Sequence, residues 1–126
     1  MTPAVSIFAA GVMVPEAVQA GRALRERGAL ASVFVVTSPA RIYRGLREPR
    51  PYLEELVSPE EEGVPLVSVL DGHSHALAFL GAALGVPQMA LGVDDFGQSG
   101  TRADLYRHHG IDAPAIARAA QVLLGG

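Results

Sequence analysis

The sequence predicts a single α/β domain with three layers, α/β/α, in which helices cover both faces of a mainly parallel sheet of four strands. Apolar segments at 5–10, 31–37, 65–70 and 87–93 alternate with segments whose apolar residues recur at helical spacing. Right-handed crossovers between such strands favour the order 2-1-3-4. At 126 residues the chain is long enough for one core, so residues 1–126 are predicted to form one domain.

The first and third segments are almost continuously apolar, as expected for strands buried on both faces of a parallel sheet. The second is rich in β-branched residues, and Pro87 at the start of the fourth favours a sheet edge. The region 44–63 is dense in proline and charge and is predicted to be a crossover of broken helical pieces. The residues predicted to be buried are Val5, Ile7, Val33, Val35, Val67, Val69, Leu80 and Leu91.

Helix boundaries are marked by familiar signals. Pro15 and Glu16 suit the first turn of a helix that follows the first strand, and Gly28 is its expected end. The predicted inward stripe of that helix is Val14, Ala17, Val18, Gly21 and Leu24. After the third strand, one continuous helix is predicted to end at Gly85, with Ala76, Leu77, Leu80, Ala83 and Leu84 on its inner face.

The C-terminal part is predicted to hold two helices. Thr101 and Asp104 fit a capping box at the start of the first, and Gly110 is expected to end it. Asp112 is the expected cap of the second. The inner face of that last helix is predicted to carry Ala113, Ile116, Ala117, Ala120 and Leu124.

Composition excludes several classes of chemistry. The chain contains no cysteine, which rules out disulfides and thiolate metal sites, and all ten of its basic residues are arginine, which rules out lysine Schiff bases and the Walker phosphate loop. A net charge of -3 gives no reason to expect a nucleic acid partner. No apolar run approaches the roughly 20 residues of a membrane span, and no basic region precedes the first apolar run. The expectation is a cytoplasmic protein.

Ligands of open α/β sheets bind beyond the carboxyl ends of the strands, where the strand order reverses. In this chain that crevice would lie between the loops at 11–15 and 71–75, flanked by 37–38 and 96–100. The polar side chains expected to meet there are Asp71, His73, His75, Gln98, Ser99 and Arg102.

Several readings of these residues compete. Asp71, His73 and His75 could hold a metal ion, and the helix that follows Gly100, aided by Arg102, could bind an anion. A serine hydrolase is disfavoured because the sequence has no Gly-x-Ser-x-Gly elbow. A dinucleotide site is disfavoured because the sequence has no Gly-x-Gly-x-x-Gly motif after the first strand. The favoured reading is that Asp71, Ser99 and Thr101 cap loops and helix starts, and no residue of the chain is assigned a catalytic, cofactor-binding or metal-binding role.

Three groups of residues resemble the C-terminal domain of the transketolase superfamily. The first comprises Phe-Gly-Gln-Ser-Gly at 96–100, Arg-Ala-Asp-Leu-Tyr at 102–106 and Gly-Ile-Asp at 110–112. The second is Gly-Val-Met-Val-Pro-Glu-Ala at 11–17 with Val-Val-Thr-Ser-Pro at 35–39, and the third is Leu-Asp-Gly-His at 70–73. Within this superfamily the chain is most similar to the homodimeric type of the thiamine-diphosphate-dependent first component of pyruvate dehydrogenase.

The resemblance implies a domain that is not catalytic alone. In these enzymes thiamine diphosphate lies between two other domains, and a Gly-Asp-Gly motif with a downstream asparagine holds its magnesium. This chain has neither that motif nor any asparagine, so it is expected to bind neither cofactor alone, although the parent enzyme would use both.

The expected role is in structure and assembly, and the alternative is a small-ligand or anion-binding module that uses the crevice. The family domain also begins with an antiparallel edge strand, which here would lie before Met1. The expected partners are therefore copies of this chain, or separate subunits that carry the thiamine-diphosphate domains.

Overall fold

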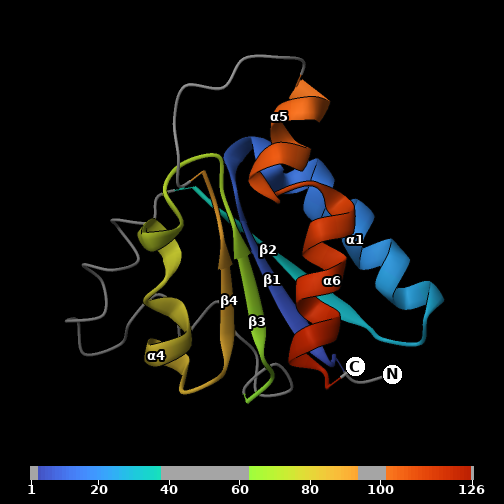
Figure 1. Cartoon of the computed structure of the whole chain (residues 1–126). Helices are drawn as coiled ribbons and strands as arrows, with labels where there is room; N and C mark the ends of the chain where they lie inside the picture. The colour runs from blue at the N-terminus through green and yellow to red at the C-terminus, as the bar shows by residue number, and fades with distance from the viewer. Residues whose placement is uncertain (1–2, 38–62, 94–101, 126) are drawn as a thin grey trace.

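The computed structural model describes residues 3–37, 63–93 and 102–125. Its sheet has four parallel strands, β1 (Val5–Ala10), β2 (Ala31–Val36), β3 (Leu66–Val69) and β4 (Gln88–Leu91). They lie in the order β2-β1-β3-β4 (Figure 1). β4 is therefore an edge strand of this sheet, and Pro87 immediately precedes it in the chain. The α/β fold class and the strand order predicted from the sequence are both confirmed.

Helices cover both faces of the sheet (Figure 1). On one face α1 (Val14–Glu26), which follows the 3-10 turn η1 (Gly11–Met13), packs beside α6 (Ala113–Leu123). The 3-10 turn η2 (Ser74–Leu77) and the helix α4 (Leu80–Leu84) lie on the other face. The helix α5 (Arg102–His109) leads into α6. In the described ranges, no helix is long and apolar enough to cross a membrane.

Several helices begin and end at the residues predicted from the sequence. Pro15 lies in the first turn of α1, and beyond its last turn Gly28 has a φ of 88° and donates its N–H to the carbonyl of Arg25. Gly110 ends α5 with a φ of 70°. The side chain of Asp112 accepts a 3.1 Å hydrogen bond from the N–H of Ala115 and so caps α6. These caps satisfy backbone groups that have no partner inside the helix.

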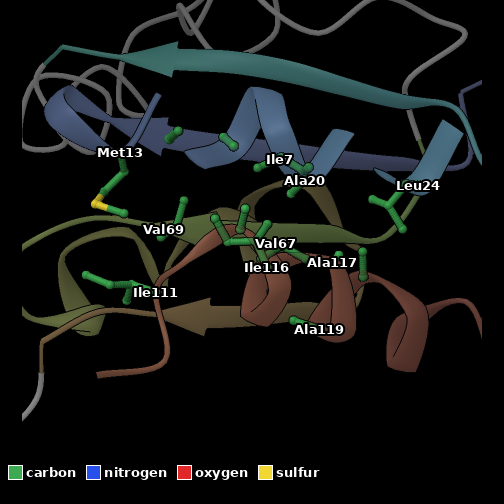
Figure 2. Packing of buried hydrophobic residues seen from close by; sticks show 14 of the residues in the cluster. Ile7, Met13, Ala20, Leu24, Val67, Val69, Ile111, Ile116, Ala117 and Ala119 are labelled. Carbon is green, nitrogen blue, oxygen red and sulfur yellow. The ribbon is translucent and has the colours of Figure 1, made fainter. Parts of the chain in front are cut away.

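Alternation along the strands divides the core into two parts. Val5, Ile7 and Ala9 face α1 and α6 together with Val67 and Val69 of β3. Figure 2 shows Ile7, Val67 and Val69 in this part of the core. The helices meet them largely through buried alanines, which are Ala17 and Ala20 on α1 and Ala113, Ala117, Ala119 and Ala120 on α6. The large part of the core therefore lies between the sheet and these two helices.

The smaller part of the core lies on the opposite face. There Phe8 stacks on Phe34 of β2 with ring centroids 4.7 Å apart, and Leu77 and Leu80 are fully buried. The helix predicted as continuous in this region is instead two short pieces, η2 and α4, separated by Ala78 and Phe79. Ala76 and Ala83, expected on its inner face, are exposed, and Leu84 is partly buried.

Three further predictions of burial are wrong. Val35 is 54% exposed because β2 is an edge strand and Val35 lies near its end, whereas Val18 is 38% exposed on the outer side of α1. Leu124 is 40% exposed because α6 ends one residue before it. Val33 and Leu91, on the two edge strands, are partly buried, and the other predicted core residues are buried. Residues 44–62 of the crossover predicted at 44–63 lie outside the described residues, as does the cap at Thr101.

Candidate functional site

The loop that follows β3 carries three of the predicted site residues, Asp71, His73 and His75, and all three are exposed. His73 caps η2: its Nδ1 accepts a 3.2 Å hydrogen bond from the backbone N–H of His75. The two imidazole rings lie 4.4 Å apart, centroid to centroid, at an interplanar angle of 56°. One ring nitrogen of His73 is thus occupied by the capping bond.

The same loop is held against the end of β4. The N–H of Val93 donates a 2.7 Å hydrogen bond to the carbonyl of Gly72. Gly92 is buried so close to the loop that a Cβ there would lie 2.6 Å from both the carbonyl oxygen of Gly72 and the backbone nitrogen of Ser74. The loop is therefore fixed by backbone contacts that leave no room for a side chain at Gly92.

No group of three or more metal-ligating side chains comes together among the described residues. Asp71 is thus not grouped with His73 and His75 as the metal hypothesis requires. Two imidazoles supply only half of the ligands of a four-coordinate zinc site.

The remaining predicted site residues belong to the stretch around 94–101. Gln98 and Ser99 lie outside the described residues, as do Gly97 and Gly100. Arg102 is the first residue of α5, and the structure describes its backbone position only. A meeting of these residues with Asp71 in one crevice stays a prediction.

Sequence reasoning missed the best-connected polar side chain of the described residues. Gln88 donates from Nε2 to the hydroxyl oxygen of Ser68 at 2.8 Å and to the carbonyl of Leu77 at 2.9 Å. Its Oε1 accepts a 2.6 Å hydrogen bond from the N–H of Gly81, near the start of α4. The available signal was a glutamine and a serine inside otherwise apolar strands, since buried polar groups need partners.

These contacts describe a structural arrangement. The His73 ring caps a turn, and Gln88 joins two strands to the short helices above them. The capping reading of Asp71, Ser99 and Thr101 stays a prediction, since Ser99 and Thr101 lie outside the described residues.

Comparisons with known proteins agree with the fold. A curated relative from Methanocaldococcus jannaschii, named as a transketolase C-terminal section, is 29% identical over 119 residues. That match covers 90% of this chain and 34% of the relative. The plasmid-encoded transketolase of Cupriavidus necator is 31% identical over 122 residues, which cover 97% of this chain and 17% of that enzyme. The chain thus spans about a third or less of the curated relatives it matches.

Solved structures show the same fold. One solved structure is a split-gene transketolase described as an inactive tetramer of beta subunits. It superposes with a TM-score of 0.75 and 24% identity, and the match covers 99% of this chain and 40% of that one. A transketolase from Campylobacter jejuni gives a TM-score of 0.62 with 16% identity, covering 99% of this chain and 17% of that one. The family model of the transketolase-like TK C-terminal domain matches residues 1–112. With that match over most of its length, and with the strand order 2-1-3-4 of its sheet, the chain belongs to the transketolase-like C-terminal domain family.

Proposed function

We propose that this chain acts as the C-terminal domain of a thiamine-diphosphate-dependent enzyme, with a role in structure and assembly and no catalysis of its own. The observation that carries the proposal is the family match over residues 1–112, in a chain that lacks Gly-Asp-Gly and any asparagine. In the enzymes it resembles, those residues hold the magnesium of the cofactor. Thiamine diphosphate and magnesium would then be bound by other domains of the parent enzyme.

Two parent activities fit this proposal. The relatives found by comparison are named as transketolases. The motifs at 96–100, 102–106 and 110–112 favour the homodimeric pyruvate dehydrogenase component, which the same superfamily includes. No contact in the described residues favours the alternative role of a small-ligand or anion-binding module.

A domain-replacement experiment tests the proposed role. The C-terminal domain of the Cupriavidus necator transketolase is replaced by this chain, and the purified chimaera is assayed for ketol transfer, pyruvate oxidation and bound thiamine diphosphate. We expect the chimaera to bind the cofactor and to assemble, whereas the enzyme truncated before that domain assembles poorly. A chimaera no better assembled than the truncated enzyme contradicts the proposal.

Calorimetric titration of the chain alone with thiamine diphosphate and magnesium is the matching control. We expect no heat of binding because the cofactor ligands of the family are missing from this sequence. Tight binding by the chain alone would show that it carries a cofactor site, and the non-catalytic role would then be wrong.

Assembly has its own test. The partners we propose are further copies of this chain or separate subunits with the cofactor-binding domains, and a tetrameric split-gene relative supports both. A stable interface between copies would bury about 1,200 Å² or more in total. Sedimentation equilibrium at micromolar concentration should show a dimer or larger species, and a single species at 13.2 kDa would leave the separate subunits as the partners.

A further inference from the structure

The 3-10 turn η2 is capped by a titratable side chain. His73 is the N-cap residue of η2, and its Nδ1 accepts a 3.2 Å hydrogen bond from the backbone N–H of His75. A neutral imidazole has one ring nitrogen that accepts a hydrogen bond and one that carries a proton. Because Nδ1 accepts in this cap, the proton of the neutral ring lies on Nε2. The cap therefore fixes one tautomer of His73.

The fixed tautomer separates His73 from the histidines of metal sites. A histidine that binds a metal ion gives the lone pair of one ring nitrogen to the metal, and its other nitrogen donates a hydrogen bond. In His73 the lone pair of Nδ1 faces the N–H of His75, and Nε2 carries the proton. His73 is thus arranged to cap the turn, and it would have to give up the cap to bind a metal ion.

Protonation removes the cap. An imidazolium carries a proton on both ring nitrogens, so it has no acceptor left for the N–H of His75. The neutral form of His73 makes this bond and the charged form does not. The contribution of the bond to stability is therefore present at high pH, and it is lost as the pH falls through the range in which histidine is protonated.

Several ionisable groups surround His73. The ring of His75 lies 4.4 Å away, and Asp71 is exposed on the same loop. β3 and β4, the strands packed against η2, contain no charged residue. Asp94 and Asp95 follow β4 in the sequence and lie outside the described residues. These groups can change the pH at which the cap is lost, but not the direction of the change, because an imidazolium never accepts the bond.

The rest of the loop does not depend on a proton. The bond from the N–H of Val93 to the carbonyl of Gly72 joins two backbone groups, as does the bond from the N–H of Ala76 to the carbonyl of His73. Neither backbone group titrates. Loss of the cap is therefore expected to change the start of η2 and to leave the loop attached to β4.

We propose that His73 is a proton-sensitive cap, which holds the start of η2 when its ring is neutral and releases it when the ring is protonated. The same proton changes the surface, because residues 72–93 contain no aspartate, glutamate, lysine or arginine. Apart from His75, the exposed residues of η2 and α4 are Ala76, Ala82 and Ala83. This uncharged surface gains positive charge as the pH falls. The inference concerns the chain's own loop, and it holds whichever enzyme the chain belongs to.

Nuclear magnetic resonance of the full chain tests the tautomer first. The nitrogen chemical shifts of the His73 ring distinguish a proton on Nε2 from a proton on Nδ1. At about pH 8, where the ring is neutral, we expect the proton on Nε2. A proton on Nδ1 at this pH would overturn the proposal, because the ring could not then accept the capping bond.

Solvent exchange of the His75 amide tests the release. Its rate is divided by the rate of the same amide in an unstructured peptide at the same pH, so that the intrinsic effect of pH cancels. We expect this ratio to rise roughly two- to tenfold between about pH 8 and about pH 5, as one hydrogen bond is lost. A ratio that does not change with pH would show that protonation leaves the cap intact.

Two variants assign the effect to one ring. Asparagine is also a good N-cap and does not titrate, so the rise in the ratio should disappear in His73→Asn. His109→Asn, which removes an imidazole from α5, is the matched control and should keep the rise. The proposal fails if the rise persists in His73→Asn, or if it disappears in His109→Asn.

Discussion

Gln88 on β4 donates a 2.8 Å hydrogen bond from its side-chain amide to the hydroxyl oxygen of Ser68 on the neighbouring strand β3. The same amide reaches the carbonyl of Leu77 and the N–H of Gly81, so one side chain ties two strands to η2 and α4. Phe79 is the N-cap residue of α4, and its side chain makes no capping hydrogen bond. Gln88 instead accepts a hydrogen bond from the N–H of Gly81, which is one of the first N–H groups of α4.

Replacing Gln88 by methionine keeps the length of the side chain and removes its polar atoms. Ser68, Leu77 and Gly81 would each lose a hydrogen-bond partner in a partly buried site. We expect the free energy of unfolding in urea to fall by about 2–4 kcal/mol, because a buried polar group left unpaired costs about 1–3 kcal/mol. The same change at Gln19, which is exposed on α1, is the control and should have little effect.

Gly92→Ala tests the close approach between β4 and the loop after β3. The added Cβ would lie 2.6 Å from backbone atoms of Gly72 and Ser74, so the loop must move. We expect a loss of about 2 kcal/mol or more in unfolding free energy. Gly72→Ala is the matched control, because its Cβ would meet only Cδ1 of Leu70 at 3.6 Å. Equal effects from the two changes would mean that the loop is not held by this contact.

Gly21→Ala should have the opposite sign. Gly21 lies inside α1, and a Cβ there would make ordinary contacts at 3.6 Å with Val33 and 3.9 Å with Ala31. Alanine is favoured over glycine in a helix interior by about 0.5–1 kcal/mol. We therefore expect a higher melting temperature in thermal unfolding followed by circular dichroism. A lower one would show that α1 lies closer to β2 than these distances indicate.

Val69→Ala and Val35→Ala compare a buried valine with an exposed one. Val69 is fully buried in β3 (Figure 2), whereas Val35 is 54% exposed on β2. The first change should lower the unfolding free energy by about 1–3 kcal/mol, since it removes buried methyl groups and leaves a cavity. The second should cost clearly less. If urea unfolding gave equal losses, the assignment of Val35 as an exposed residue would be wrong.

Asp112→Ala removes the cap of α6. The N–H of Ala115 would lose the side-chain oxygen that it bonds at 3.1 Å. We expect a loss of about 1 kcal/mol in unfolding free energy. Asp112→Ser should keep most of the stability, because serine is also a good cap. A serine variant as unstable as the alanine variant would point to a role for the Asp112 carboxylate other than capping.

Strand positions, strand order and most helix ends were predictable because they depend on local patterns. Continuous apolar runs indicate strands buried on both faces, and Gly28, Gly110 and Asp112 act through their own backbone or the next turn. The exposure of Val18 and Val35 was not predictable in this way. Periodicity identifies an apolar side of an element, but only the tertiary arrangement decides which elements lie at an edge.

The position of the loop after β3 was predictable from the sequence, but its internal contacts were not. The loop of Asp71, His73 and His75 does follow the central strand β3, as the alternation of elements predicts. The capping bond to His73 depends on the short 3-10 turn, and the tight contact of Gly92 depends on residues twenty positions earlier in the chain. Neither relationship has a local signal in the sequence.

The layer of α1 and α6 meets its surroundings mainly through alanines, among them Ala17, Ala20, Ala117 and Ala120. Side chains of this size have no rotamers to adjust, so the spacing between helices and sheet is set by the backbones themselves. A larger residue on one helix can then be accommodated only if a facing residue becomes smaller or the whole helix shifts. Sequence change in this layer is thus expected to proceed through compensating pairs, while the opposite layer, packed by leucine and phenylalanine, can accept single exchanges of similar volume.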